Sequence, residues 1–200
     1  MSETVPSETV PSESLSNEVS STSPRELISA ERLQARIAEL ALDIERDYAS
    51  VVEPGDRLIA VGVLKGSVFF MVDLLRRVQA VPVAVDFFQT SSYRDGTSPG
   101  EVRIVKDIDL SIRGRHVLLI EDIVDTGYTL RTILDLLRFR GAASVRLCAL
   151  LDKAARREVE VPIDYRGFGI EDVFVVGYGL DCAERYRNLP YIGVYEAGEE

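Results

Sequence analysis

The residues whose types and spacing best suit chemistry lie in the segment HVLLIEDIVDTGYTLRTI, residues 116–133. An apolar run typical of a buried strand ends there in two adjacent acids, Glu121 and Asp122, and a short loop leads to a helix expected to start at about Thr129. In parallel α/β sheets, ligands bind beyond the carboxyl ends of the strands. The two carboxylates are therefore placed where they could bind a metal ion or the hydroxyl groups of a sugar.

The loop after these acids has the composition of a phosphate-binding site. Backbone N–H groups at the start of a helix lack intrahelical partners, and the helix dipole favours an anion there. Gly127 would let the backbone approach a ligand closely. Neither the Walker A spelling nor GxGxxG occurs in the sequence, so neither a P-loop nor a dinucleotide-binding motif is indicated. The expected phosphate-binding residues are Asp125, Thr126, Gly127, Tyr128 and Thr129.

Apolar strands alternating with helices would have to position this segment. Strands are indicated over residues 57–64, 81–88, 116–123 and 144–151, and helices over 68–78 and 129–140. Strands that are apolar at nearly every position are buried on both faces, as in a parallel sheet covered by crossover helices. We therefore expect an α/β fold with a doubly wound, mostly parallel sheet.

One more helix is expected before these elements, because apolar residues recur at spacings of three and four from Leu33 to Tyr48. Ser29 is a good N-cap for it. The sequence Ser-Pro-Arg-Glu that begins at Ser23 has the spelling of a capping box and competes for the start. The sequence leaves both starts open.

Three stretches depart from this alternation. Residues 89–101 read as a long polar loop of the kind that forms functional lids. From Val161 onward the pattern is short and irregular, which indicates a small flap, or hood, beside the sheet. Residues 1–23 are rich in Ser and Glu and contain SETVP twice, so we expect a disordered acidic tail and one domain over residues 24–200.

Composition limits the function further. The formal net charge of -10 argues against binding DNA or RNA through a basic surface. No apolar run approaches the roughly 20 residues that span a bilayer, so no membrane association is expected. Cys148 and Cys182 lack metal-ligand spacing and are interpreted as reduced thiols of a cytoplasmic protein.

The spelling EDIVDTGYTL resembles the phosphoribosyl-diphosphate signature of the type I phosphoribosyltransferases, in their hypoxanthine-guanine branch. Four further segments agree with that family, and together the five span about residues 25–195. They are VLKGS at 63–67, SSYRDGTSPGEVRIVKD at 91–107, LLDK at 150–153, and the segment from Val173 that begins VFVVGYGLD.

For the central segment, the resemblance implies binding of phosphoribosyl diphosphate. Glu121 and Asp122 would hold the ribose hydroxyls, directly or through Mg²⁺, and residues 125–129 would bind the 5′-phosphate. Asp125 would be the general base that takes the proton from purine N7 as N9 attacks C1′.

The resemblance also implies a diphosphate site and a mobile loop. Lys65 and Gly66 fall in the loop whose main chain binds the diphosphate, and the family often has a non-proline cis peptide there. Arg187 matches a position that contacts the diphosphate. Ser92 and Tyr93 match the loop that closes during turnover.

Recognition of a 6-oxopurine base would fall on the flap. By the same resemblance, Lys153 would donate to the 6-oxo group, which rejects adenine. Phe174 would stack on the ring, Val175 would offer main-chain groups to its edge, and Asp181 would bind a second Mg²⁺. Relatives are commonly homodimers or homotetramers.

Several alternatives stay open. The Arg156–Arg157 pair is interpreted as solvated, with the alternative that Arg157 assists the diphosphate. Two departures from the family pattern, LKGS without a second glycine and Ala154–Ala155 where proline is common, leave local geometry undetermined. The leading function is transfer of the phosphoribosyl group to hypoxanthine or guanine; the rivals are a regulatory protein that binds phosphoribosyl diphosphate without turnover and an enzyme for another base.

Overall fold

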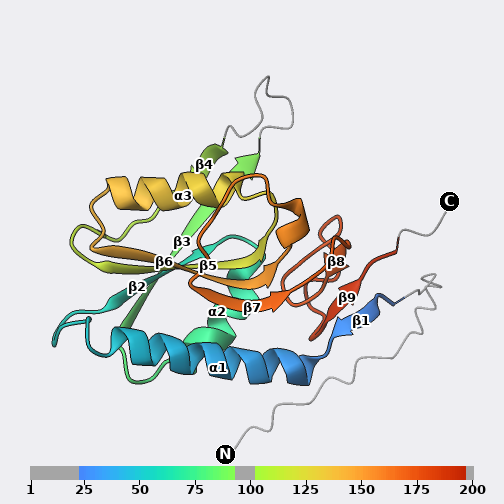
Figure 1. Ribbon diagram of the computed structural model, residues 1–200, viewed down its shortest axis with the longest axis horizontal. Helices are drawn as coiled ribbons and strands as arrows, with labels where there is room; N and C mark the ends of the chain where they lie inside the picture. Colours follow the sequence, from blue (N-terminus) through green and yellow to red (C-terminus); the bar gives the residue numbers. More distant parts are fainter. Residues whose placement is uncertain (1–22, 93–101, 197–200) are drawn as a thin grey trace, which may run out of the picture.

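The computed structural model describes residues 23–92 and 102–196 (Figure 1). The predicted acidic tail, apart from Ser23, lies outside the described residues. So do Tyr93 and most of the expected lid. The disordered tail and the domain boundary therefore stay predictions.

A six-stranded sheet forms the centre of the molecule, in the order β4-β3-β2-β5-β6-β7. Every neighbouring pair is parallel except β3 with the edge strand β4. This confirms the mostly parallel sheet. The strands are β2 (Leu58–Val63), β3 (Val83–Ser92), β4 (Val102–Lys106), β5 (His116–Val124), β6 (Ser144–Asp152) and β7 (Tyr165–Gly169).

Helices cover both faces of this sheet, as a doubly wound fold requires (Figure 1). Helices α1 (Ala30–Tyr48) and α2 (Ser67–Leu75) pack on one face, and α3 (Tyr128–Phe139) packs on the other. All six residues of β2 are buried, with Ala60 in the core under α1 and α2 and Val61 in the core under α3. Each predicted strand and helix is present, with ends displaced by a few residues. None of the helices in residues 23–92 and 102–196 is long and apolar enough to cross a membrane.

Helix α1 begins after Ser29, whose Oγ accepts a hydrogen bond from the Arg32 N–H at 3.3 Å. The competing start at Ser23 is wrong, because Arg25–Ile28 form a strand, β1. That strand pairs antiparallel with β9 (Ile192–Val194), which satisfies backbone groups that a helix would have paired internally.

The flap is a three-stranded sheet in the order β1-β9-β8, with β8 at Val175–Val176. It therefore draws on both ends of the described chain, and the prediction of a flap from the C-terminal segment alone is incomplete. The residues just after Val161 are also misplaced by that prediction, because Tyr165–Gly169 form β7 of the main sheet. A strand of five residues that includes two glycines carries too weak a pattern to be recognised.

The polar stretch at 89–101 is not a loop throughout. Its first four residues continue β3, and Gln89, Thr90, Ser91 and Ser92 pair with β4. Polar side chains on this extension obscured the strand, since an edge hairpin needs no apolar pattern on both faces.

Candidate active site

The carboxyl end of β5 divides the candidate site into two subsites. Glu121 and Asp122 are consecutive strand residues, so their side chains point to opposite faces of the sheet. On the Glu121 side lies a cavity of about 200 Å³, and Asp125, Thr126 and Gly127 share its lining. We call this side the phosphate turn subsite and the Asp122 side the Asp122 subsite.

The turn between β5 and α3 is built to receive an anion. Gly127 has φ +95°, and a Cβ there would lie 2.3 Å from the Val159 carbonyl oxygen, so only glycine fits. In the described part of the chain no side chain caps α3, which begins at Tyr128. The N–H groups of its first turn are left for a ligand, and the helix dipole favours negative charge there.

Two carboxylate oxygens at this turn lack hydrogen-bond partners among the described residues, Glu121 Oε2 and Asp125 Oδ1, and both are buried atoms. Burial, with a smaller contribution from Asp122, raises the pKa of Glu121 well above its usual range. Arg156 Nε lies 3.1 Å from Asp125 Oδ1 as an ion pair, without hydrogen-bond geometry. Such groups are suited to a cation, a ribose hydroxyl or a transferred proton.

On the other face, the Asp122 carboxylate is closely surrounded by backbone. It accepts a hydrogen bond from the Ile123 N–H at 2.9 Å, and a Cβ on Gly66 would lie 1.7 Å from its Oδ2. A Cβ on Gly179 would in turn lie 2.0 Å from the Gly66 carbonyl oxygen. Burial raises the pKa of Asp122 to about 6, although the Arg187 guanidinium lowers it.

Ion pairs join the remaining residues of the Asp122 subsite. Arg187 lies 2.9 Å from Asp181 and 3.3 Å from Glu184, and the Lys65 ammonium lies 3.1 Å from Glu184. The Leu64–Lys65 peptide is cis, the form that the resemblance describes as frequent in the family at this loop. In the part of the chain that the structure describes, no group of three or more His, Cys, Asp or Glu could hold a metal ion. The carboxylates of this subsite that could hold a metal ion beside a substrate are Asp122 and Asp181.

Lys153 follows β6 directly and is 6% exposed. Its backbone N–H donates to the Val124 carbonyl at 3.0 Å, so it lies beside the end of β5. Its ammonium is 3.9 Å from Asp172, which is also 3.9 Å from Arg156. Because Arg156 pairs with Asp125, a chain of charges joins the expected purine-binding lysine to the expected general base.

Phe174 and Val175 lie at the open edge of the flap. The Phe174 side chain is 53% exposed, with its ring edge-on to Tyr195 at 6.0 Å between centroids. The Tyr195 N–H donates to the Phe174 carbonyl at 2.9 Å, so the next pair, Val175 with Val194, is the non-hydrogen-bonded kind. The backbone groups of Val175 therefore point away from β9, toward the free side of β8.

Most of the predicted residues meet at this end of the sheet. Tyr128 does not line the cavity, and Ser92 is placed only as the last residue of β3. Arg157 is not solvated as the sequence analysis held, because its side chain is only 11% exposed. The sequence shows that Arg157 lies close to the LLDK segment, but it gives no indication of which residues Arg157 contacts. The polar and charged residues of this region that the sequence did not indicate as part of the site are Thr90, Asp152, Arg156, Asp172 and Glu184.

Comparison with known proteins agrees with this geometry. The family model described as "Phosphoribosyl transferase domain" matches residues 26–183. Hypoxanthine phosphoribosyltransferase of Haemophilus influenzae is 52% identical over 168 residues, 84% of this chain and 92% of the relative. Hypoxanthine-guanine phosphoribosyltransferase of Bacillus subtilis is 46% identical over 169 residues, 84% and 91% of the two chains.

A solved structure extends the likeness to three dimensions. The crystal structure of a hypoxanthine-guanine phosphoribosyltransferase from Bacillus anthracis, with a HEPES molecule in its active site, superposes with a TM-score of 0.79 at 44% identity. The superposition covers 86% of this chain and 98% of that one. The family model and these relatives each cover most of the chain, and the chain therefore belongs to the type I phosphoribosyltransferase family.

Proposed function

We propose that the protein transfers the 5-phosphoribosyl group from phosphoribosyl diphosphate to N9 of hypoxanthine, and of guanine, giving IMP or GMP and diphosphate. The observation that carries the proposal is the uncapped start of α3 at Gly127, beside the unpartnered carboxylate oxygens of Glu121 and Asp125. A phosphate monoester on a sugar fits this combination of donors and acceptors. The names of the relatives at about half identity support the same reaction.

Asp125 acts as the general base. As the C1′–N9 bond forms and the bond from C1′ to the diphosphate oxygen breaks, the purine N7 proton passes to the Asp125 carboxylate. Its Oδ1 is free of hydrogen bonds in the described structure, which supports this role. The amides and hydroxyls of residues 125–129 hold the 5′-phosphate, with Tyr128 contributing its backbone N–H at the start of α3.

The purine lies between the flap and the end of β6. Lys153 donates to the 6-oxo group, and its burial makes that donor selective against adenine, whose amino group cannot accept it. Phe174 stacks on the base through its exposed ring, and Val175 meets the edge of the base through backbone groups directed to the free side of β8.

Glu121 and Asp122 would hold the ribose hydroxyls, directly or through Mg²⁺, and Asp181 would hold a second Mg²⁺ with the diphosphate. The buried, unpartnered Glu121 oxygen and the raised pKa of Asp122 fit a divalent cation, because both carboxylates lack sufficient counter-charge. When bound, the ion neutralises charge that develops on the leaving diphosphate.

Lys65, Gly66 and Arg187 bind the diphosphate in this proposal. The Lys65 and Arg187 cations both pair with Glu184, and Arg187 also acts on the Asp122 carboxylate beside Gly66, which supports one shared anion site. Ser92 and Tyr93 stay the residues expected to help exclude water from the sugar; Ser92 ends β3, and Tyr93 lies outside the described residues.

A direct assay tests the proposal. Purified protein is incubated with phosphoribosyl diphosphate, Mg²⁺ and, in parallel, hypoxanthine, guanine, xanthine or adenine, and nucleotide formation is followed by absorbance and chromatography. We expect turnover with hypoxanthine and guanine and none with adenine. Tight binding of phosphoribosyl diphosphate with no nucleotide formed from any base would contradict the enzyme and favour a regulatory protein.

We also propose that the protein forms a homodimer or homotetramer in the cytoplasm, as expected from its family. On the α2 side of the molecule, Phe69 and Val72 are 44% and 50% exposed. Val85 is 50% exposed and lies on the same sheet face as Phe87, which packs toward α2. This apolar surface is suited to contact a second copy of the chain. Size-exclusion chromatography with light scattering measures the molar mass in solution and so tests the oligomeric state. Both cysteines are free, as suits a reducing compartment.

A further inference from the structure

The carbonyl oxygens of the phosphate turn, residues 124–127, all have hydrogen-bond partners, and none of these partners lines the ligand cavity. Val124 O accepts from the Lys153 N–H at 3.0 Å, and Thr126 O accepts from two N–H groups, those of Glu158 and Val159, at 3.0 Å each. Gly127 O accepts from a helical N–H in α3 at 2.9 Å. The Asp125 carbonyl needs a different donor.

That donor is the side chain of Arg157. Its Nε donates to the Asp125 carbonyl at 2.9 Å, and its Nη2 donates to the Val124 carbonyl at 3.4 Å. The same Nη2 donates to the Asp152 carboxylate at 2.5 Å. One guanidinium thus links two consecutive carbonyls of the turn to an acid at the end of β6.

The direction of these bonds sets the direction of the turn amides. In a trans peptide the C=O and the N–H of the next residue point in opposite directions. Carbonyls of Val124 and Asp125 held toward Arg157 therefore turn the N–H groups of Asp125 and Thr126 toward the cavity, where the 5′-phosphate is proposed to bind.

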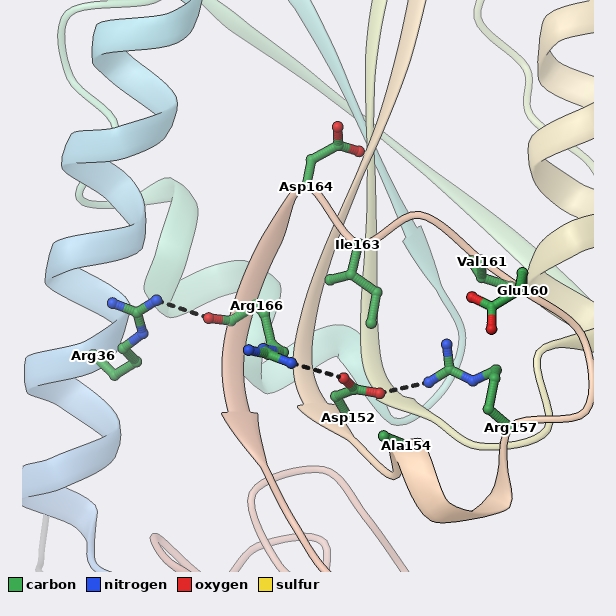
Figure 2. Close-up of a pocket in the computed structure, with 9 residues that line it drawn as sticks. All are labelled: Arg36, Asp152, Ala154, Arg157, Glu160, Val161, Ile163, Asp164 and Arg166. Carbon is green, nitrogen blue, oxygen red and sulfur yellow. Dashed lines mark hydrogen bonds and ion pairs between the residues drawn. The ribbon is translucent and has the colours of Figure 1, made fainter.

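The Arg157–Asp152 pair is buried, which makes it a stable anchor. The side chains are 11% and 7% exposed, and charge-assisted hydrogen bonds in such surroundings are strong and costly to break from one side. The short helix η1 (Ala154–Arg156) brings Arg157 back over the turn, four residues after Lys153. Figure 2 shows Asp152 between Arg157 and Arg166, at the wall of a pocket of about 530 Å³.

We infer that Arg157 is a positioning residue for 5′-phosphate binding: anchored by Asp152, it holds the Val124 and Asp125 carbonyls so that the amides that follow them face the ligand. The guanidinium lies behind the turn and is given no contact with the diphosphate, contrary to the alternative raised from the sequence. The inference rests on the proposed function, because it assumes that the turn binds the 5′-phosphate.

Arg166 supplies a matched control. It pairs with the same carboxylate, with Nη1 3.3 Å from Asp152 Oδ2, but its side chain is 61% exposed and its described bonds do not reach the turn. Replacing it removes a charge from Asp152 without removing a bond to residues 124–127.

The experiment compares Arg157→Met, Arg157→Lys and Arg166→Met with the unmodified chain. Calorimetry measures the Kd of IMP and, separately, of magnesium diphosphate, and steady-state kinetics give kcat and the KM of phosphoribosyl diphosphate. For Arg157→Met we expect IMP affinity to fall by at least about tenfold, with diphosphate affinity changed less than about twofold. Arg157→Lys, which keeps the charge but cannot span three acceptors, should recover part of the IMP affinity. Arg166→Met should leave both affinities within about twofold.

Three results would overturn the inference: equal losses of IMP and diphosphate affinity in Arg157→Met, no loss of either, or the same IMP loss in Arg166→Met. If Arg157→Met fails to fold, Arg157→Lys and Asp152→Asn decide, because each weakens the same anchor and should raise the IMP Kd selectively. Failure of the proposed function looks different, since the unmodified chain would then form no nucleotide from any base in the direct assay.

Discussion

The two subsites at the end of β5 are held in place by different kinds of interaction. In the phosphate turn subsite, backbone carbonyls are bonded to residues 153–159 and to a buried guanidinium. In the Asp122 subsite, the cations are held mainly by side-chain ion pairs, and the Lys65–Glu184 pair is 57% and 65% exposed. The turn is therefore preorganised, whereas the ion pairs must exchange partners when an anion binds. The exposed Lys65–Glu184 pair contributes typically less than about 1 kcal/mol, so breaking it costs little, whereas the side chains of the Arg187–Asp181 pair are only 23% and 28% exposed.

The largest effect is expected for Asp125→Asn, which keeps the turn and removes the proton acceptor. We expect kcat to fall by roughly 10²- to 10⁴-fold, because that is the usual contribution of general acid–base catalysis. The IMP Kd should change little, since the backbone amides remain. Single-turnover kinetics and calorimetry measure the two quantities. Asp135→Asn, an exposed carboxylate on α3, is the control, and a kcat near that of the control would remove Asp125 from the role.

Gly127→Ala tests whether the turn is as rigid as its contacts indicate. The alanine would have to adopt φ +95°, and its Cβ would lie 2.3 Å from the Val159 carbonyl oxygen. Gly55→Ala is a matched control, because Gly55 has φ +87° and nothing within 4 Å of its Cβ. Backbone strain of about 1–2 kcal/mol is common to both. We expect Gly127→Ala to lower Tm more than Gly55→Ala does, because the collision adds to the strain. IMP affinity should fall by at least about tenfold in Gly127→Ala. Equal Tm values for the two variants would mean that the turn shifts to accommodate the Cβ and is therefore not rigid.

Asp122→Asn tests how much the buried Asp122 carboxylate destabilises the ligand-free protein. Burial raises the pKa of Asp122 from its ordinary 3.8 to about 6, so folding the ionised carboxylate costs free energy above pH 6, and the cost fades as pH falls toward 3.8. An asparagine keeps the acceptor for the Ile123 N–H. With chelator at pH 7.5 we expect a higher Tm for the variant, by a free energy of at most about 3 kcal/mol.

The advantage of Asp122→Asn should shrink at pH 4.5, and adding Mg²⁺ with diphosphate should stabilise the unmodified chain more than the variant. Thermal denaturation at the two pH values measures both effects. A variant that melts lower at pH 7.5 would mean that the charge is already compensated in the folded protein.

The sequence predicted the backbone of the phosphate turn better than the contacts around it. The apolar run before Glu121 and the glycine at 127 follow local rules, so strand, turn and helix were foreseen. The partners of Arg157 are separated by up to 33 residues along the chain, and local pattern carries no information on such pairs. The β1 strand was missed for the same reason, because its partner β9 lies at the other end of the chain.

The smallest effect is expected at Glu184, whose carboxylate joins the two cations of the proposed diphosphate site. It lies 3.1 Å from the Lys65 ammonium and 3.3 Å from Arg187, and its hydrogen bond with Lys65 lowers the pKa of Glu184, so it is ionised at neutral pH. An incoming diphosphate has to displace Glu184 from both cations.

Glu184→Gln weakens this internal competitor, and we expect the Kd of magnesium diphosphate to fall by about twofold to fivefold, with IMP affinity unchanged. Calorimetry at low and high salt measures the change, which should shrink as salt screens the pairs. Glu160→Gln is the control, because the Glu160 side chain lines the pocket at Asp152 and, in the described structure, forms no ion pair with Lys65 or Arg187. Weaker diphosphate binding in Glu184→Gln would show instead that Glu184 orients the cations, and the Asp122 subsite would then be as preorganised as the turn.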